Sequence, residues 1–435
     1  MKTKSWLLTG AAVGLMALAA AAPAEAASKK STAAAQAAEI EALKEQVRLL
    51  TQRLDAQEAA QQQTQATAVQ AQATAQEAKA AQESAAQDIE NIPSQVNMAV
   101  AAIPKPKKTW AEDTKVSGRM YFDLSNVEAK NNGTKTTPSG TGFDIKRFYV
   151  GIDHKFNDTW SANVTTDFQY SSAISATEVY IKKAYLEAKV NPYLTVDFGS
   201  TDLPWVPYAE GIYGYRHIEN TLIDRTKFGT SADWGVHAKG TLPGGIVSYQ
   251  VSVINGAGYK APLRSKGMDV EGRVSAKLDK INLAIGGYSG KLGKDTQGAT
   301  TYHTANRFDA LAAYVDPKFR VGVEYFAAED WSNVATVASD KSDGYSLFGS
   351  YNFTDKISAF GRYDYVKPNK DTASNKKDSY FNIGVQYEPT KIVDLALVYK
   401  RDQVEHGTLS TSNGTIGGSN KGTYDEIGLF GQLRW

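Results

Sequence analysis

The segment 201–230, TDLPWVPYAEGIYGYRHIENTLIDRTKFGT, concentrates side chains that bind solutes. Arginine and lysine form charge-assisted hydrogen bonds to anions, and aromatic rings present large apolar faces. The candidate residues are Trp205, Tyr208, Tyr213, Tyr215, Arg216, Arg225 and Lys227. Because Glu210, Glu219 and Asp224 lie among them, the pattern indicates a site of mixed charge.

The four aromatic residues of this segment leave two interpretations open. They pin the segment to a surface, or they form a slide on which the apolar faces of a sugar stack. A freely solvated loop is disfavoured because four large rings need something to pack on. An outward surface loop nevertheless remains the alternative to a segment that folds inward.

Further basic residues occur at every second position in runs that alternate polar and apolar side chains. They are Arg119, Arg147, Lys183, Arg273, Arg320, Arg362 and Arg434, and acidic residues such as Asp123, Asp167 and Glu324 share the same polar face. Rings of basic side chains select anions and rings of acidic ones select cations, so a mixed lining selects weakly. The alternative is that these charges only avoid lipid, which costs about 2–4 kcal/mol for Lys or Arg at the bilayer midplane.

Signals for catalysis are few. The five histidines show no HExxH spacing, and the chain has neither a G-x-S-x-G nucleophile elbow nor a phosphate-binding loop. We therefore predict no catalytic residue, no metal site and no cofactor. An outer-membrane hydrolase using His217 with Asp224 or Glu219 remains a remote alternative.

The alternating runs predict a transmembrane β-barrel. The last ten residues, EIGLFGQLRW, alternate with a period of two, as in a strand that has one apolar face. Sixteen such segments follow residue 114, each about as long as the ~9–11 residues that a tilted strand needs to cross a bilayer. They lie at 115–125, 143–156, 159–171, 178–190, 193–200, 231–241, 245–254, 267–278, 280–289, 304–315, 318–328, 343–353, 356–366, 378–388, 391–401 and 423–435.

The connections between these segments alternate in length. Seven are short and rich in Asn, Asp, Pro and Gly, and they alternate with eight longer polar loops. This layout is typical of an even-stranded outer-membrane barrel of about 16 antiparallel strands. Aromatic residues flank the short turns, as expected of a girdle at the membrane interface: Phe156, Trp160, Tyr193, Phe319, Phe353, Tyr387 and Trp435.

The N-terminal quarter of the chain has a different character. Residues 1–26 have the charged, apolar and small-residue regions of a secretory signal peptide, which predicts export. Within 27–92, apolar residues repeat at heptad positions from Ile40 through Leu54 to Ile92, which predicts an α-helical coiled coil and hence an oligomer. Pro93 is expected to end the helix, 93–113 to be a linker, and 114–435 to be the barrel.

Composition excludes other classes of protein. There is no cysteine, so disulfides and thiolate chemistry are absent. Lys plus Arg number 48 and Asp plus Glu number 47, so the chain lacks the basic field that nucleic-acid binding requires.

Several motifs resemble the phosphate-selective porin O/P family. They are KRFYVGIDHKF (146–156), KKAYLEAKV (182–190), DFGSTDLPW (197–205) and the terminal GLFGQLRW. The resemblance implies a homotrimer of sixteen-stranded barrels in which the third long loop, here 201–230, folds inward as the constriction. The family's phosphate members depend on a dense run of arginines, which this sequence does not match strand by strand, so the resemblance does not by itself imply phosphate specificity.

We therefore expect an outer-membrane diffusion porin that passes small hydrophilic solutes, with at most a weak preference for anions such as phosphate or carboxylates. Its barrel contacts outer-membrane lipid, and its coiled coil lies in the periplasm, with possible cell-wall contact. Two further alternatives are a sugar-selective porin and a structural tether of the outer membrane that acts through the coiled coil.

Overall fold

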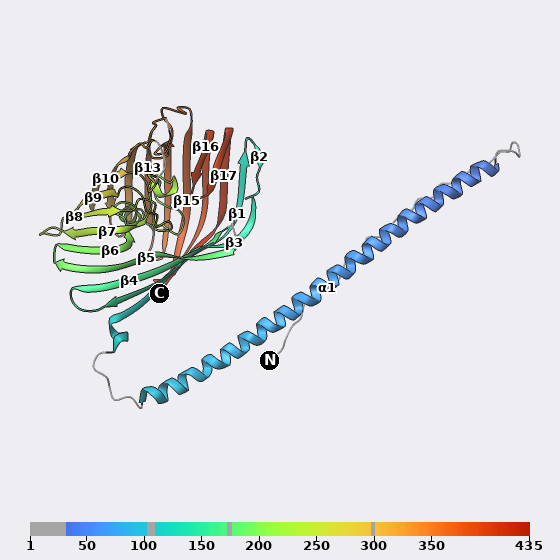
Figure 1. Cartoon of the computed structure of the whole chain (residues 1–435), viewed down its shortest axis with the longest axis horizontal. Coiled ribbons are helices and arrows are strands. Elements are labelled where there is room, and N and C mark those ends of the chain that lie inside the picture. Colours follow the sequence, from blue (N-terminus) through green and yellow to red (C-terminus); the bar gives the residue numbers. More distant parts are fainter. Residues whose placement is uncertain (1–31, 102–108, 172–175, 297–300, 337) are drawn as a thin grey trace. The chain divides into compact units, whose positions relative to one another are not determined.

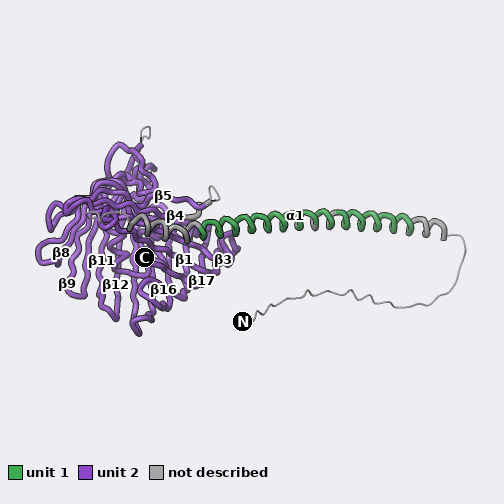
Figure 2. The backbone as a smooth tube through the Cα atoms, turned by 90° about the horizontal axis from the view of Figure 1, so that it is seen from below, with its two compact units in different colours: residues 1–106 green, residues 107–435 purple. Residues whose placement is uncertain are grey.

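The computed structural model describes residues 32–101, 109–171, 176–296, 301–336 and 338–435. The chain divides into two compact units, residues 1–106 and residues 107–435 (Figure 2). The predicted signal peptide, 1–26, lies outside the described residues.

The described residues of the first unit form a single long helix, α1 (Thr32–Ala101). Its 70 residues correspond to about 105 Å at 1.5 Å per residue. The apolar heptad residues at its start are all more than half exposed: Ile40, Leu43, Val47, Leu50 and Leu54. The helix that the heptads predict is present, and its apolar seam has no partner within the described chain.

The expectation that Pro93 ends this helix is wrong, because α1 continues to Ala101. A proline within a helix removes one backbone hydrogen bond and disfavours the preceding turn. The following residues, SQVNMAVA, include three alanine or methionine residues, which are strong helix formers, so the helix resumes. Among the described helices, none combines the length and the apolar character that a membrane span requires.

The second unit is a β-barrel (Figure 1). Its strands are β1 (Thr114–Asn131), β2 (Thr134–Lys135), β3 (Gly140–Lys155), β4 (Trp160–Ser171), β5 (Ala176–Asn191), β6 (Leu194–Asp202), β7 (Ala232–Thr241), β8 (Val247–Ile254), β9 (Asp269–Leu278), β10 (Ile281–Gly290), β11 (Ala305–Val315), β12 (Phe319–Glu329), β13 (Lys341–Asn352), β14 (Ile357–Lys367), β15 (Lys377–Thr390), β16 (Val393–Thr411) and β17 (Gly414–Arg434). Short helices are η1 (Trp110–Asp113), α2 (Val206–Tyr213) and α3 (Leu222–Arg225).

The sheet closes on itself. Every long strand pairs antiparallel with its neighbours in the chain, and β1 pairs with both β3 and β17. Of the seventeen strands in the described sheet, β2 has only two residues and extends a loop, which leaves sixteen in the wall. The predicted sixteen-stranded antiparallel barrel is confirmed, and each predicted segment overlaps one of these strands.

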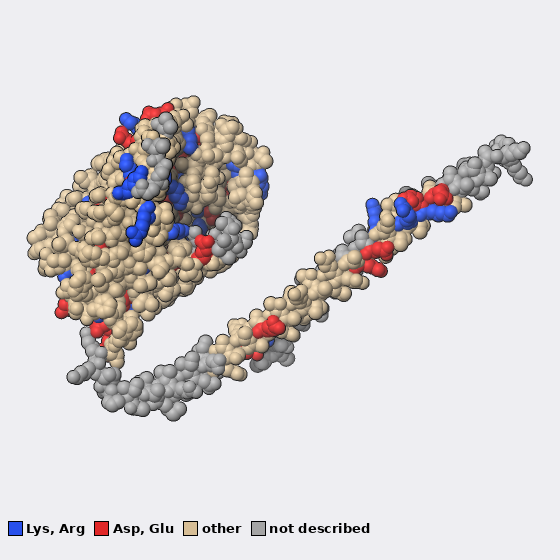
Figure 3. Space-filling view, in the orientation of Figure 1, with Lys and Arg blue, Asp and Glu red and all other residues tan. Residues whose placement is uncertain are grey.

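Side chains alternate between the two faces of the wall, as the sequence predicted. In β15, Ile383 and Val385 are exposed on the outer face, whereas Tyr380 and Asn382, which precede them, are buried. Leu397 of β16 is 63% exposed. In Figure 3 the visible wall of the barrel carries few charged side chains. An outer face of this composition suits hydrocarbon, where an exposed charge is costly.

Residues at the chain terminus seal the barrel. Trp435 donates a backbone hydrogen bond to the carbonyl of Gly118 (3.1 Å) and accepts one from its N–H (3.0 Å). The indole also covers Gly118, where a β-carbon would lie 1.9 Å from a ring atom. Phe122 covers Gly431 in the same way, with a ring atom at 2.1 Å. Two aromatic rings seated on glycines therefore fix the register of the β1–β17 seam.

We expect Gly118→Val to destabilise the barrel, because its side chain must displace the Trp435 indole from the seam. Overpacking of this kind costs about 1–3 kcal/mol. The change should appear as a lower midpoint of urea unfolding in detergent, followed by heat-modifiable mobility on gels. Gly142→Val is the matched control, since a β-carbon at Gly142 in β3 has nothing within 4 Å. Equal midpoints for the two variants would contradict the sealing role of Trp435.

Candidate functional site: the lumen and its inward loop

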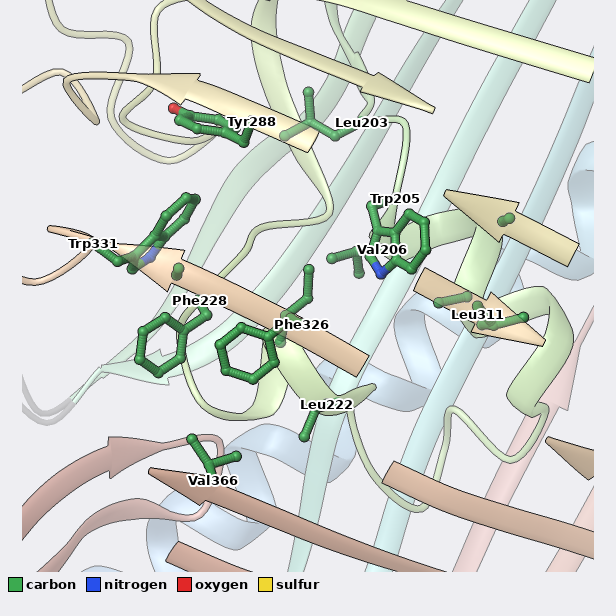
Figure 4. Close-up of a cluster of buried hydrophobic side chains, with 14 of the residues drawn as sticks. Leu203, Trp205, Val206, Leu222, Phe228, Tyr288, Leu311, Phe326, Trp331 and Val366 are labelled. Atoms are coloured by element: carbon green, nitrogen blue, oxygen red, sulfur yellow. The ribbon is translucent and has the colours of Figure 1, made fainter. Parts of the chain in front are cut away.

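The long segment 201–230 packs against the inner face of the wall (Figure 4). Pro207 lies in the first turn of α2, where its missing N–H costs nothing, and Gly214 ends the helix with φ of 68°. Leu203, Trp205 and Leu222 are almost completely buried in one apolar cluster with residues of several wall strands. In Figure 4, Trp205 and Val206 face the strands that carry Leu311 and Phe326. The segment is therefore a packed element.

Two glutamates of the wall hold the start of this segment. Glu324 on β12 accepts hydrogen bonds from the Trp205 indole (2.6 Å) and from the Tyr213 hydroxyl. Glu271 on β9 accepts one from the Trp205 backbone N–H (3.1 Å). All four residues are buried. A buried carboxylate must be hydrogen-bonded to remain in place, so these contacts also satisfy wall charges that have left water.

The aromatic candidates of the segment use their faces for packing. Tyr213 stacks on Phe348 with centroids 3.9 Å apart, and Tyr215 stacks on Phe360 at 4.1 Å. Tyr208 lies under the Arg273 guanidinium at 4.2 Å. Trp205 has no exposed surface. The contacts thus correspond to pinning of the segment: Trp205 and Tyr213 are buried, and Tyr208 and Tyr215 each have a ring face in contact with another side chain.

Arg225 lies in a closed charge cluster. Its guanidinium pairs with Asp364 of β14 (2.9 Å), Asp378 of β15 (2.5 Å) and Asp402 of β16 (3.0 Å), and all four side chains are fully buried. The expectation that Arg225 offers a hydrogen bond to a passing anion is therefore corrected. The sequence places these aspartates 139 to 177 residues away, so no local pattern reveals the cluster.

The other two basic candidates of the segment are more accessible. Arg216 pairs with Glu210 and, at 3.6 Å, with Asp224, while part of its surface faces open space. Burial alone would lower the pKa of Arg216, but Glu210, Tyr149 and Asp224 raise it above its usual value. Lys227 is exposed. Arg216 is therefore a permanent cation beside an acidic partner.

His217 adds no charge to the lumen at neutral pH. It is buried, and its Nε2 has no hydrogen-bond partner among the described residues. Burial, together with the positive charges of Arg434 and Lys146, lowers the pKa of His217 from 6.5 to about 3. The two acidic residues considered for a hydrolase are engaged elsewhere: Glu219 with Lys400 and Asp224 with Asn220.

The basic residues predicted on the wall all lie on strands whose polar side chains point inward, and most have polar partners. Arg147 pairs with Asp167 at 2.8 Å, and Lys183 with Asp202 at 2.5 Å. Arg362 pairs with Asp364 at 2.6 Å, Arg434 pairs with Asp394 at 3.0 Å, and Arg273 donates to the carbonyl of Pro204 at 2.7 Å.

Arg119 and Arg320 differ from this group. Within the described parts of the chain, the Arg119 guanidinium donates to the Tyr121 hydroxyl alone, at 3.3 Å. The Nε of Arg320 is buried without a hydrogen-bond partner, and its guanidinium lies over Gly214, where a β-carbon would meet it at 2.0 Å. Among the described residues, neither arginine forms an ion pair with a carboxylate.

Two β-bulges add lysines that strict alternation missed. The register shifts between Tyr121 and Phe122 on β1, opposite Lys146 of β3. It shifts again between Thr165 and Thr166 on β4, opposite Lys182 of β5. A bulge inserts one extra residue and re-aims its side chain, so Lys146 joins Arg147, and Lys182 joins Lys183, on the inner face. The only sequence signal is that two basic residues are adjacent within an alternating run.

The two added lysines have different surroundings. Lys146 lies 3.4 Å from Asp123 and over the ring of the buried Phe430, at 4.4 Å. Lys182 lies over the Tyr149 ring at 4.6 Å and donates to its hydroxyl at 3.4 Å. Within the described part of the chain, Lys182 forms no ion pair with a carboxylate. It is therefore a third cation without an acidic partner.

Open space lies on two sides of the inward segment, one toward the wall of β1, β3 and β5 and the other toward the wall of β12 to β17. One cavity of about 400 Å³ and another of about 540 Å³ share Arg119, Glu210, Gly211, Arg216 and Arg434 in their linings. Arg320 also lines the first cavity, and Lys182 the second. The first reaches the short turns at Asp316 and Thr354. The two cavities are thus contiguous, and Arg119, Lys182 and Arg320 line them.

This architecture matches known proteins. The family described as phosphate-selective porin O and P matches residues 114–278. The matched residues lie within the barrel. The resemblance seen in the sequence motifs is confirmed, and the family match together with the barrel supports an outer-membrane channel for small solutes. A comparison with curated protein sequences gave no significant match.

Solved structures share the fold at low sequence identity. An anion-selective porin from Comamonas acidovorans has 11% identity and a TM-score of 0.56, covering 74% of this chain and 99% of its own. The outer membrane channel DcaP of Acinetobacter baumannii has 13% identity and a TM-score of 0.54, covering 74% and 97%. OmpT of Vibrio cholerae has 15% identity and a TM-score of 0.52, covering 74% and 97%. These likenesses concern the barrel.

We expect Arg225→Ala to destabilise the packed segment, because it leaves three buried aspartates without their cation. Removing one partner of a buried ion pair costs about 3–5 kcal/mol. Limited proteolysis within 201–230 and the urea midpoint measure the loss. Arg216→Ala is the control, because its partly exposed pairs should contribute no more than about 1 kcal/mol. A variant at Arg225 as stable as the one at Arg216 would contradict the anchoring role.

Proposed function

We propose that this protein is an outer-membrane diffusion porin with a weak preference for small anions, such as phosphate or carboxylates. The observation that carries the proposal is the placement of Arg119, Lys182 and Arg320. Each faces the contiguous cavities, and none forms an ion pair with a carboxylate among the described residues. Segment 201–230 would act as the constriction, since it occupies the lumen beside these cavities.

Unpaired cations favour anions by raising their local concentration. A positive charge at a wet wall attracts an anion by about 1 kcal/mol at 4 Å in bulk water, and more where the wall lowers the effective dielectric. Most other basic residues of the lumen have carboxylate partners, so their fields largely cancel. The net effect is a modest preference rather than a tight site, and salt should screen it.

The preference can be tested at Lys182. We expect Lys182→Gln to lower the permeability ratio of anion to cation about two- to five-fold, the factor for one unit charge at 4–8 Å in water. The reversal potential of the purified channel in a salt gradient measures this ratio. Lys155→Gln is the matched control, since Lys155 is exposed beside a short turn and pairs with Asp158 at 2.6 Å. An unchanged reversal potential for Lys182→Gln would place that lysine outside the ion path.

A sugar-selective channel has less support. The four aromatic residues that suggested it are buried or stacked on the wall and on Arg273. A structural tether uses only α1 and does not explain cavities that run beside unpaired cations. Block of the ionic current by phosphate, dicarboxylates or maltodextrins ranks the solutes directly, and a folded barrel that passes no current would leave the tether as the function.

We further propose a homotrimer whose α1 helices form a coiled coil in the periplasm, in reach of the cell wall. The apolar heptad side chains of α1 support this, because Ile40, Leu43, Val47, Leu50 and Leu54 are exposed in a single chain and burial requires a partner helix. The likeness to a trimeric form of Vibrio cholerae OmpT, with 15% identity and a TM-score of 0.50, concerns the barrel fold.

Two adjacent leucines provide the test of this assembly. Leu50 occupies a seam position of the heptad, whereas Leu49 lies off the seam, and both are about half exposed in the single chain. We expect Leu50→Ala to lower the temperature of trimer dissociation, because a truncated core leucine costs about 2–5 kcal/mol per helix. Leu49→Ala should leave it unchanged, and neither variant should alter conductance per pore. Equal effects of the two substitutions would exclude the proposed seam.

A further inference from the structure

A second segment also enters the lumen. The ladder between β16 and β17 continues beyond its register shift at Glu405 and Gly407, pairing Gly407 with Gly418 and Thr411 with Gly414. We name residues 407–418 the inner hairpin. At its base, His406 has φ of 56° and Gly407 has φ of 144°, while Ser419 and Asn420 have no ladder partner. Positive φ at His406 and Gly407 bends β16, and the ladder with β17 is interrupted at the same level.

The bend is held from a neighbouring loop. Asn132 accepts hydrogen bonds from the backbone N–H groups of Asn420 (2.9 Å) and Lys421 (3.1 Å), and it donates to the Ser419 hydroxyl at 3.0 Å. Gly422 of β17 lies against the hairpin, since a β-carbon there would be 2.3 Å from the Gly417 nitrogen. The inner hairpin is therefore folded back onto the strand from which it comes.

The tip of the hairpin contacts both the wall and segment 201–230. Ser412 donates its backbone N–H to the Arg225 carbonyl (2.8 Å) and its hydroxyl to Glu219 (2.6 Å). Asn413 donates to Asp402 at 3.1 Å and accepts from Lys400 at 3.2 Å. Lys400 and Asp402 precede the bend in β16, and their side chains are buried inside the wall. The tip thus points back into the lumen.

We propose that the inner hairpin is a second constriction, latched to segment 201–230 through Ser412, and that it sets the size limit of the channel. This inference rests on the proposed diffusion function. The hairpin affects the width of the pore and not its ion preference, because residues 407–418 contain no charged side chain. The charge that sets ion preference lies elsewhere, on β1, β5 and β12.

The contacts of the inner hairpin are weak enough for it to detach from segment 201–230. Leu409 and Ile416, which pair across the ladder, are its only large apolar residues, so the hairpin buries little apolar surface. Its tip is held by four hydrogen bonds, of which Ser412 and Asn413 donate three and Asn413 accepts one from Lys400. Glycines at both ends of the bend permit rotation of the hairpin as a unit. Segments with few buried contacts open at low free-energy cost.

Removal of the hairpin provides the first test. Residues 408–417 are replaced with Asn-Gly, which closes the cross-strand pair Gly407 and Gly418 with a two-residue turn and keeps the bend. Heat-modifiable mobility and circular dichroism of the full chain verify folding. We expect single-channel conductance to rise at least about 1.5-fold, with entry of larger neutral sugars into liposomes, because the pore is wider. The reversal potential should not change.

A point variant tests the latch without altering the hairpin. Ser412→Ala removes the hydroxyl that donates to Glu219, a hydrogen bond to a charged acceptor. We expect brief openings to the conductance level of the deletion variant to become about tenfold more frequent, because the hydrogen bond to Glu219 no longer stabilises the closed position of the hairpin. Ser410→Ala is the control, because Ser410 is exposed on the same hairpin and only its backbone takes part in the ladder.

The outcomes separate this inference from the proposed function. A folded deletion variant with the conductance and size limit of the wild type overturns the second constriction. If the wild-type protein passes no current and the deletion variant conducts, the second constriction is supported in a stronger form, in which the hairpin closes the pore. If neither protein conducts, the diffusion function fails and the inference with it. If Lys182→Gln shifts the reversal potential but the deletion does not change the conductance, the proposed diffusion function stands and the role of the hairpin is rejected.

Discussion

Pairing of every backbone N–H and C=O group within the bilayer is the constraint on which the structure depends. Hydrocarbon offers no alternative partner, and an unpaired group costs several kcal/mol, so a sheet in a membrane must close. Here the closing seam joins β1 and β17, and its last bonds join Gly118 to Trp435. The glycines of the seam are necessary because Trp435 and Phe122 need their space. The terminal tryptophan thus completes the ladder and lies at the interface with its ring partly exposed.

Closure with sixteen strands creates a second requirement, because a barrel of this width is too wide for wall side chains to fill. The chain uses two inserted elements, and both are held by charges of the inner wall. Arg225 meets three aspartates, and the Ser412 hydroxyl donates to Glu219, which in turn pairs with Lys400. Charges that alternation keeps away from lipid therefore position the elements of the lumen. The charges left without an ion pair are the ones available to a solute.

Much of this could be predicted from the sequence because the governing patterns are local. A period of two gives strands, short turns give connectivity, and aromatic residues at the turns give the membrane boundary. The bulges at Lys146 and Lys182 could not be predicted, since they depend on register against a neighbouring strand. The cluster around Arg225 depends on residues more than a hundred positions away. Residues 402–422 have no clear alternation to mark β16 and β17 as continuing to the inner hairpin, so both strands were predicted too short.

The division of roles within the lumen follows from these placements. One side of the barrel, from β9 to β16, carries the residues that bind segment 201–230, and their charges are largely satisfied by it. The side formed by β1, β3 and β5 borders the cavity of about 540 Å³, and there the bulge at Lys182 adds a cation that lies against the Tyr149 ring and hydroxyl. The cavity of about 400 Å³ reaches β12 to β17. Strict alternation places one inward side chain every two residues. A bulge is the simplest way to exceed that density, and it raises the positive charge of the wall without lengthening a strand. Under the proposed function, selectivity would depend on register irregularities as much as on residue type, because a regular β5 would present one cation fewer to the lumen.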